Sequence, residues 1–156
     1  GEYENAEREE DLGTPRQYGL TQGHKHLKEM KAISGIENSP VFCPVVAPFY
    51  SGMEVTVPIF KNMLKSGTTI EDIKNIYKAK YQGPIVNFSE NNDESGFISA
   101  GAYSGADTME ISVFGNEERI ILTARYDNLG KGASGAAIEC LNIVLGQDET
   151  TGLVVK

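Results

Sequence analysis

Two histidines stand close together in the stretch GHKHLKE, and they are the only histidines among the 156 residues of the chain. If residues 23–26 are extended, His24 and His26 point to the same side, because side chains of an extended segment alternate. Two rings that titrate near neutral pH form an acid/base site or an anion-binding site. A surface or structural role is the other interpretation, and the residues alone leave both open.

A second candidate is the glycine-rich stretch DNLGKGASGAAIE, residues 127–139. Gly130, Gly132 and Gly135 have the G-x-G-x-x-G spacing of a turn that cradles a dinucleotide pyrophosphate. A complete nucleotide-binding unit needs another parallel strand and an acidic residue about 20 positions further on, whereas only 21 residues follow Gly135. The stretch is therefore a self-contained site, a place where small residues let a helix approach another backbone, or a turn that meets a cofactor held mainly by another domain. We favour the third interpretation.

The two cysteines, Cys43 and Cys140, lie in the apolar runs VFCPVV and IECLNIV. This setting predicts reduced, buried side chains of a cytoplasmic protein, and it disfavours the thiolate that a nucleophile requires. No cysteine or carboxylate near the histidines completes a metal-ligand set, so we expect no metal site.

Charge and hydropathy exclude several classes of partner. The formal net charge is −8, and Lys and Arg form no basic stripe, so neither nucleic acid nor an anionic membrane surface is an expected partner. No apolar run reaches the length of a membrane span. Residues 1–17 begin with an acidic stretch and are expected to form a loop or flexible segment.

The pattern of apolar residues predicts the elements that position these candidates. Spacing of three indicates a short helix over residues 27–33, ended by Gly35. Two strands are expected over 41–50 and 52–60, joined by a turn at 48–52, and Pro58 suggests that the donor side of the second is unpaired there.

The second half of the chain should contain two helices and three strands. A capping box of Thr68 and Glu71 begins a helix that runs to about residue 81. Strands follow over 83–90, 108–114 and 119–127, the last two forming an antiparallel hairpin. A final helix, residues 133–145, is apolar enough to be buried along most of its length. The class is α+β: a mixed, mostly antiparallel sheet covered by helices on one face, in a single domain over 1–156.

Taken together, three stretches resemble one family: HKHLKE at 24–29, PVFCPVVAPFYSGMEVTVPI at 40–59, and YDNLGKGASGAA at 126–137. The chain resembles the C-terminal domain of N-acetyl-gamma-glutamyl-phosphate reductase, over about residues 18–153. The resemblance implies a catalytic and dimerisation domain like the C-terminal domain of glyceraldehyde-3-phosphate dehydrogenase.

The resemblance also implies a chemistry. In this family a cysteine thiolate attacks an acyl phosphate, the thioester takes hydride from NADPH, and a histidine serves as acid/base. His24 matches that histidine, and His26 is expected to contact the substrate anion. Asn128 would hydrogen-bond the nicotinamide carboxamide. The residues expected to bring backbone near the cofactor and to dock the helix on the nucleotide domain are Lys131, Gly132 and Gly135.

Two parts of such an enzyme are missing from the sequence. It contains no S-N-P-G-C-type segment for the nucleophile and no N-terminal Rossmann domain, which is expected to hold most of the NADP. We therefore expect a fragment that is inactive alone and that forms a homodimer or homotetramer. The alternatives are an aspartate-semialdehyde dehydrogenase-like domain, a domain of a carrier-linked acyl-phosphate reductase, and a dimerisation or interaction module without catalytic activity.

Overall fold

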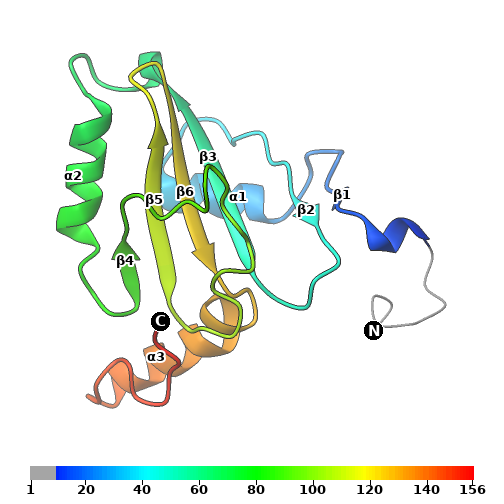
Figure 1. The fold of residues 1–156 in the computed structure, drawn as a ribbon, viewed down its shortest axis with the longest axis vertical. Helices are drawn as coiled ribbons and strands as arrows, with labels where there is room; N and C mark the ends of the chain where they lie inside the picture. The colour runs from blue at the N-terminus through cyan, green and yellow to red at the C-terminus, as the bar shows by residue number, and fades with distance from the viewer. Residues whose placement is uncertain (1–9) are drawn as a thin grey trace. The chain divides into compact units, whose positions relative to one another are not determined.

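The computed structural model describes residues 10–156, in two compact units that divide between Tyr50 and Ser51 (Figure 1). Most of the acidic stretch predicted to be a loop lies in residues 1–9, outside the described residues. The described part of 1–17 contains a 3-10 turn, Glu10–Gly13, and a two-residue strand.

The first unit contains a small antiparallel sheet and one helix. Strand β1, Arg16–Gln17, pairs with β2, Val45–Val46. The strand predicted over 41–50 is thus reduced to two residues, because Pro44 and Pro48 flank it and lack the N–H groups that a longer ladder needs. Helix α1, His26–Ser34, ends as predicted at Gly35, whose N–H donates to the carbonyl of Lys31.

The second unit is built on a four-stranded sheet with the order β3-β6-β5-β4. Strands β5 and β6 form the predicted hairpin, and β3 adds to β6 antiparallel with Met53 opposite Tyr126. Only β4 runs parallel to its neighbour β5. The mixed, mostly antiparallel sheet confirms the predicted α+β class, and Pro58 lies in the edge strand, where prolines are tolerated. The strands are Met53–Phe60 (β3), Val86–Phe88 (β4), Met109–Gly115 (β5) and Arg119–Tyr126 (β6).

Helix α2, Ile70–Lys80, packs on one face of this sheet near β4 and β5 (Figure 1). Its capping box consists of Thr69 and Asp72, one residue later than predicted. The core lies between helix and sheet, where Ile73 contacts Val113 and Ile120, and partly buried apolar side chains surround them.

The opposite face of the sheet carries a buried ion cluster. Arg125 is 4% exposed and donates to the Glu110 carboxylate at 2.7 Å and to Glu94 at 2.6 Å. Glu94 belongs to the segment 89–107, which crosses in front of β5 and β6 (Figure 1). The Tyr103 hydroxyl also donates to Glu110, and burial together with this carboxylate raises the pKa of Tyr103 to about 12. The cluster fixes the crossing segment on the sheet.

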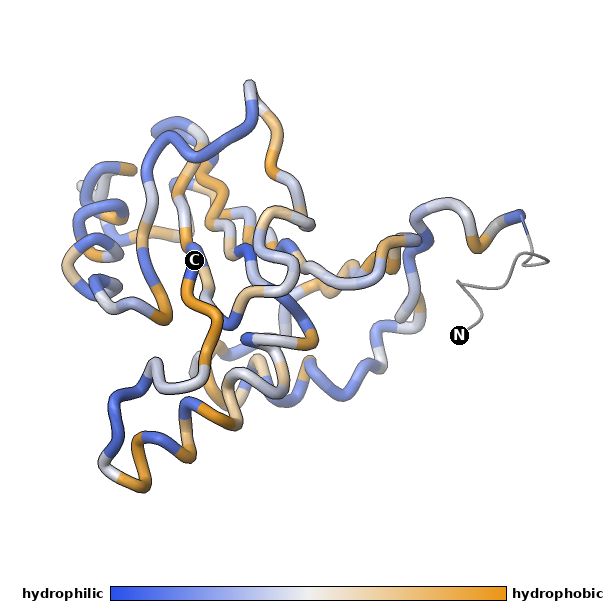
Figure 2. Tube along the Cα trace, turned by 60° about the horizontal axis from the view of Figure 1, so that its bottom comes forward, coloured by the Kyte–Doolittle hydropathy of each residue, from blue (hydrophilic) through white to orange (hydrophobic). Residues whose placement is uncertain are grey.

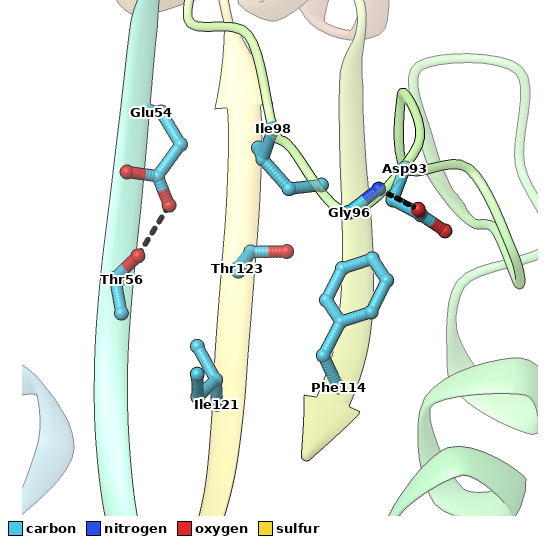
Figure 3. A pocket seen from close by; sticks show the side chains of 8 residues that line it. All are labelled: Glu54, Thr56, Asp93, Gly96, Ile98, Phe114, Ile121 and Thr123. Carbon is cyan, nitrogen blue, oxygen red and sulfur yellow. Dashed lines mark hydrogen bonds between the residues drawn. The ribbon is translucent and has the colours of Figure 1, made fainter.

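Beside the ion cluster the same face is open. A cavity of about 540 Å³ is lined by side chains of β3, β5 and β6 together with residues of the crossing segment (Figure 3). Ile121 and Phe60 on this face are 39% and 55% exposed.

Helix α3, Gly135–Val144, follows a π-helical turn, Gly130–Ser134. The prediction that it is buried along most of its length is wrong: Leu141 is 55% and Val144 82% exposed. Figure 2 shows the hydrophobic residues toward its C-terminal end. Of the residues of this largely apolar helix, only Gly135 and Asn142 are buried in the described part of the second unit.

Candidate active site

The two histidines lie together in the first unit, but not in the predicted way. Lys25 has helical dihedral angles and His26 begins α1, so residues 23–26 are not extended. The rings nevertheless meet edge to face, with centroids 4.6 Å apart. The imidazoles therefore lie together because the chain turns into the helix between them, and not through the extended backbone on which the prediction depended.

A hydrogen bond from the backbone fixes the tautomer of the neutral His24 ring. Its Nδ1 accepts from the backbone N–H of His26 at 3.3 Å, so the neutral ring carries its proton on Nε2. Protonation of Nδ1 would break this bond. His24 is half-buried between the rings of Tyr18 and Phe42, whose centroids lie 5.9 and 5.1 Å away. The ring is therefore held with its donor nitrogen available to a ligand oxygen.

Gln22 positions this cluster, and sequence reasoning did not identify it. Its side-chain amide donates to the carbonyl of Phe42 at 2.7 Å and accepts from the Phe42 N–H at 2.9 Å. The pair of bonds holds the Phe42 ring beside both histidines. No sequence periodicity signals such a contact, because it joins two irregular segments 20 residues apart.

The second group of candidates lies where β6 ends. Asn128 is half-buried, and its Oδ1 accepts from the Gly52 N–H at 2.9 Å. The preceding residue, Asp127, is 2% exposed. Burial alone would raise the pKa of Asp127, but hydrogen bonds from Gly105, Ser51 and the following turn together lower it to about 2.

Lys131, Gly132 and Gly135 lie in the turn and at the start of α3. Lys131 forms an ion pair with Glu139, and both side chains are largely buried. The Gly132 N–H donates to the carbonyl of Asp127 at 2.8 Å. The positive charge of Lys131 is thus already partnered within the helix.

The glycine spacing has a packing explanation within the chain. A Cβ at Gly130 would clash with the carbonyl of Ala106, and one at Gly135 with the carboxylate of Asp107. A Cβ at Gly132 would press on the Tyr126 ring and the Asp127 carbonyl. Close approach to the backbone of another segment therefore occurs at Gly130, whereas Gly135 makes room for the Asp107 side chain and Gly132 for the Tyr126 ring. Contact with a cofactor at Gly132 and Gly135 remains a prediction.

Neither cysteine is buried, which corrects the prediction of core residues. Cys43 and Cys140 are both exposed and free. Cys43 stands in an irregular segment beside β2, and Cys140 on the uncovered side of α3. The apolar neighbours that suggested burial are themselves partly exposed.

Over residues 10–156, no group of three or more His, Cys, Asp or Glu side chains could hold a metal ion. In the same part of the chain no helix is both long and apolar enough to cross a membrane. The structure brings His24 and His26 together in the first unit, and in the second it places Asn128, Lys131, Gly132 and Gly135 along the segment that leads from β6 into α3.

The mixed sheet backed by a helix, with a glycine turn leading into α3, defines the class of the domain as α+β. The family model described as semialdehyde dehydrogenase, dimerisation domain, matches residues 2–128, and the chain belongs to this family.

Curated relatives carry the name given by the sequence resemblance. The chain is 42% identical to N-acetyl-gamma-glutamyl-phosphate reductase 2 of Nostoc sp. over 144 residues, covering 87% of this chain and 45% of the relative. It is 41% identical to the N-acetyl-gamma-glutamyl-phosphate reductase of Sinorhizobium medicae, with 82% and 43% covered. The chain thus spans slightly less than half the length of these relatives.

Proposed function

We propose that this chain is the catalytic and dimerisation portion, over residues 18–153, of a reductase that converts N-acetyl-glutamyl 5-phosphate to N-acetyl-glutamate 5-semialdehyde in arginine biosynthesis. The observation that carries the proposal is the contact between the two histidine rings. The chain that contains them is about 40% identical to reductases of that name. The matched span is less than half of each relative, so the remaining parts of the enzyme are proposed to lie in a nucleotide-binding domain.

His24 is the proposed catalytic residue and His26 the proposed contact to the substrate anion. Neutral His24 donates from Nε2, which suits an acyl or phosphate oxygen on which negative charge develops. His26 is more exposed, and its Nε2 lies 3.9 Å from the Glu29 carboxylate.

NADP is the proposed cofactor, held mainly by the nucleotide-binding domain. When bound, it supplies the hydride for reduction. The residues of this chain fit it at one point: Asn128 Oδ1 already accepts from Gly52, so its two amide hydrogens remain to donate to a carboxamide oxygen. We place Lys131, Gly132 and Gly135 beside this contact, where they shape the turn. The exposed apolar side of α3 is proposed to pack on the nucleotide-binding domain.

The full-length enzyme should reduce N-acetyl-glutamyl phosphate with NADPH, with a kcat/KM at least tenfold above that for aspartyl phosphate or a carrier-linked acyl phosphate. The present chain alone should show no turnover. A higher kcat/KM for a competing acyl phosphate would reassign the substrate, and turnover by the isolated chain would contradict the proposed division of the site.

Histidine variants test the roles in the same assay. His24→Asn should lower kcat by about 100-fold, the scale of general acid–base catalysis, while His26→Asn should mainly raise the KM for the acyl phosphate. Cys43→Ala is the control and should leave both constants unchanged. The reverse pattern would give the acid/base role to His26, and equal effects of His24→Asn and Cys43→Ala would remove the histidine assignment.

A further inference from the structure

Asp127 joins three separate segments of the second unit. Its Oδ2 accepts from the Ser51 hydroxyl at 2.7 Å and from the Gly105 N–H at 2.6 Å. Its Oδ1 accepts from the N–H groups of Leu129 and Gly130 at 2.7 and 3.1 Å. All of these donors are neutral, and the carboxylate is buried, so the four bonds alone compensate for its loss of water.

The Ser51 side of this network leads directly to Asn128. Gly52 follows Ser51, and its N–H donates to Asn128 Oδ1. The backbone at Gly52 has a φ of 120° and lies so close to Ala100 that a Cβ there would be only 2.5 Å from the Ala100 carbonyl oxygen. The position of the Gly52 N–H is therefore fixed by Asn128 on one side and by the Ala100 backbone on the other.

These contacts decide which end of the Asn128 amide faces a ligand. A backbone N–H can only donate, so the atom it meets is the amide oxygen, and the NH2 group points elsewhere. The backbone that follows Asn128 is also held, because the N–H groups of Leu129 and Gly130 donate to Asp127 Oδ1.

We propose that Asp127 is a positioning residue: it holds the Ser51–Gly52 backbone and the turn of residues 128–130 together, so that Asn128 presents its amide hydrogens to the nicotinamide carboxamide. This inference rests on the proposed function. Asp127 itself is buried and does not touch the cofactor; it acts through Asn128.

A double-mutant cycle in the full-length enzyme tests it, with the dissociation constant of NADPH as the readout. Asn128→Ala should weaken NADPH binding about tenfold, the scale of one hydrogen bond. Asp127→Asn should weaken NADPH binding by a similar factor. The NH2 group of the new asparagine cannot accept a hydrogen bond, so some of the four groups that donate to the Asp127 carboxylate lose their acceptor. In the Asn128→Ala background, Asp127→Asn should have no further effect.

Controls separate positioning from general damage. Asp148→Asn removes an exposed carboxylate that accepts from Thr150 and should leave NADPH binding unchanged. Ser51→Ala removes one of the four hydrogen bonds to Asp127 and should weaken NADPH binding about threefold. This variant replaces Asp127→Asn in the test if Asp127→Asn does not fold.

The NMR spectrum of the 156-residue chain gives an independent readout. The side-chain amide signals of Asn128 and the backbone signal of Gly52 should shift in Asp127→Asn. Unchanged signals together with unchanged NADPH binding would overturn the inference and leave the role of Asn128 intact. Additive effects of the two substitutions would also overturn it. If Asn128→Ala does not alter NADPH binding, the cofactor role of Asn128 fails, and this inference fails with it.

Discussion

At the scale of single residues, the structure changes which side chain in DNLGKG matters most for the architecture. The sequence predicts a cofactor contact at Asn128 and assigns no role to Asp127, although a local signal for Asp127 is present. An aspartate two or three residues before a glycine turn commonly accepts from the backbone ahead of it, as Asp127 does from Leu129 and Gly130. Its bonds to Ser51 and Gly105 join segments distant in the sequence and had no local signature.

The lowered pKa of Asp127 predicts how stability responds to acid. Its folded-state value of about 2 lies below the ordinary 3.8, so the native state favours the carboxylate. The stabilisation, about 2 kcal/mol, is complete above about pH 5 and is lost as pH falls through 3.8 to below about 2. Urea unfolding at several pH values checks this. The Asp127→Asn variant should lose less stability over that interval, and an equally steep loss would contradict the assignment.

At the scale of elements, helix ends show how local and tertiary effects divide. The sequence predicted α2 correctly but placed its cap at Thr68, because Thr68 and Glu71 fit the capping-box spacing. Thr69 and Asp72 fit it equally well, and they make the bonds: Asp72 N–H donates to Thr69 Oγ1 at 3.1 Å, and Thr69 N–H to the Asp72 carboxylate at 2.8 Å. Two overlapping copies of one motif cannot be separated by pattern alone.

Paired substitutions identify the functioning cap. Thr69→Ala should lower the free energy of unfolding by about 1 kcal/mol, because an orphan N–H of the first helical turn loses its acceptor. Thr68→Ala, the matched control, should change it by less than about 0.5 kcal/mol. Denaturant unfolding of both variants measures this, and a larger loss for Thr68→Ala would return the cap to the position predicted from the sequence.

At the scale of the whole molecule, the uncovered surfaces indicate association. The chain belongs to a family described as a dimerisation domain. We propose that the sheet face opposite α2, where Ile121 and Phe60 are exposed, pairs with a second copy in a homodimer or homotetramer. This face is continuous across β3, β6 and β5, as the pairing register shows.

A charge on this face should prevent association. Ile121→Glu is expected to reduce the sedimenting mass to that of one chain, because an interface would bury the new carboxylate without a partner. Ile76→Glu is the matched control: Ile76 is 59% exposed on α2 and should leave the mass unchanged. An unaltered mass in Ile121→Glu would exclude this face as the interface.

Prediction from the sequence succeeded where a signal was local or periodic. It gave the β5–β6 hairpin, the edge position of β3, α1 with its terminal glycine, and the proximity of the two histidines. It failed for the strand over 41–50, where prolines outweighed β-propensity, and for the burial of α3. An apolar helix shows that a partner surface is needed, but not that this surface lies within the same chain.

By itself, the sequence determined the fold class, the family and the residue types of the candidate site, because alternation, glycine turns and the H-x-H pair are encoded within short stretches. Only the tertiary structure decided how those residues are held. It gave the glycines of DNLGKGASG a packing role against Ala106 and Asp107, and it oriented Asn128 through Gly52 and Asp127. The reason is physical: a hydrogen bond or a close backbone contact depends on distance in space, and segments separated by about 20 to 80 residues leave no periodic trace of it.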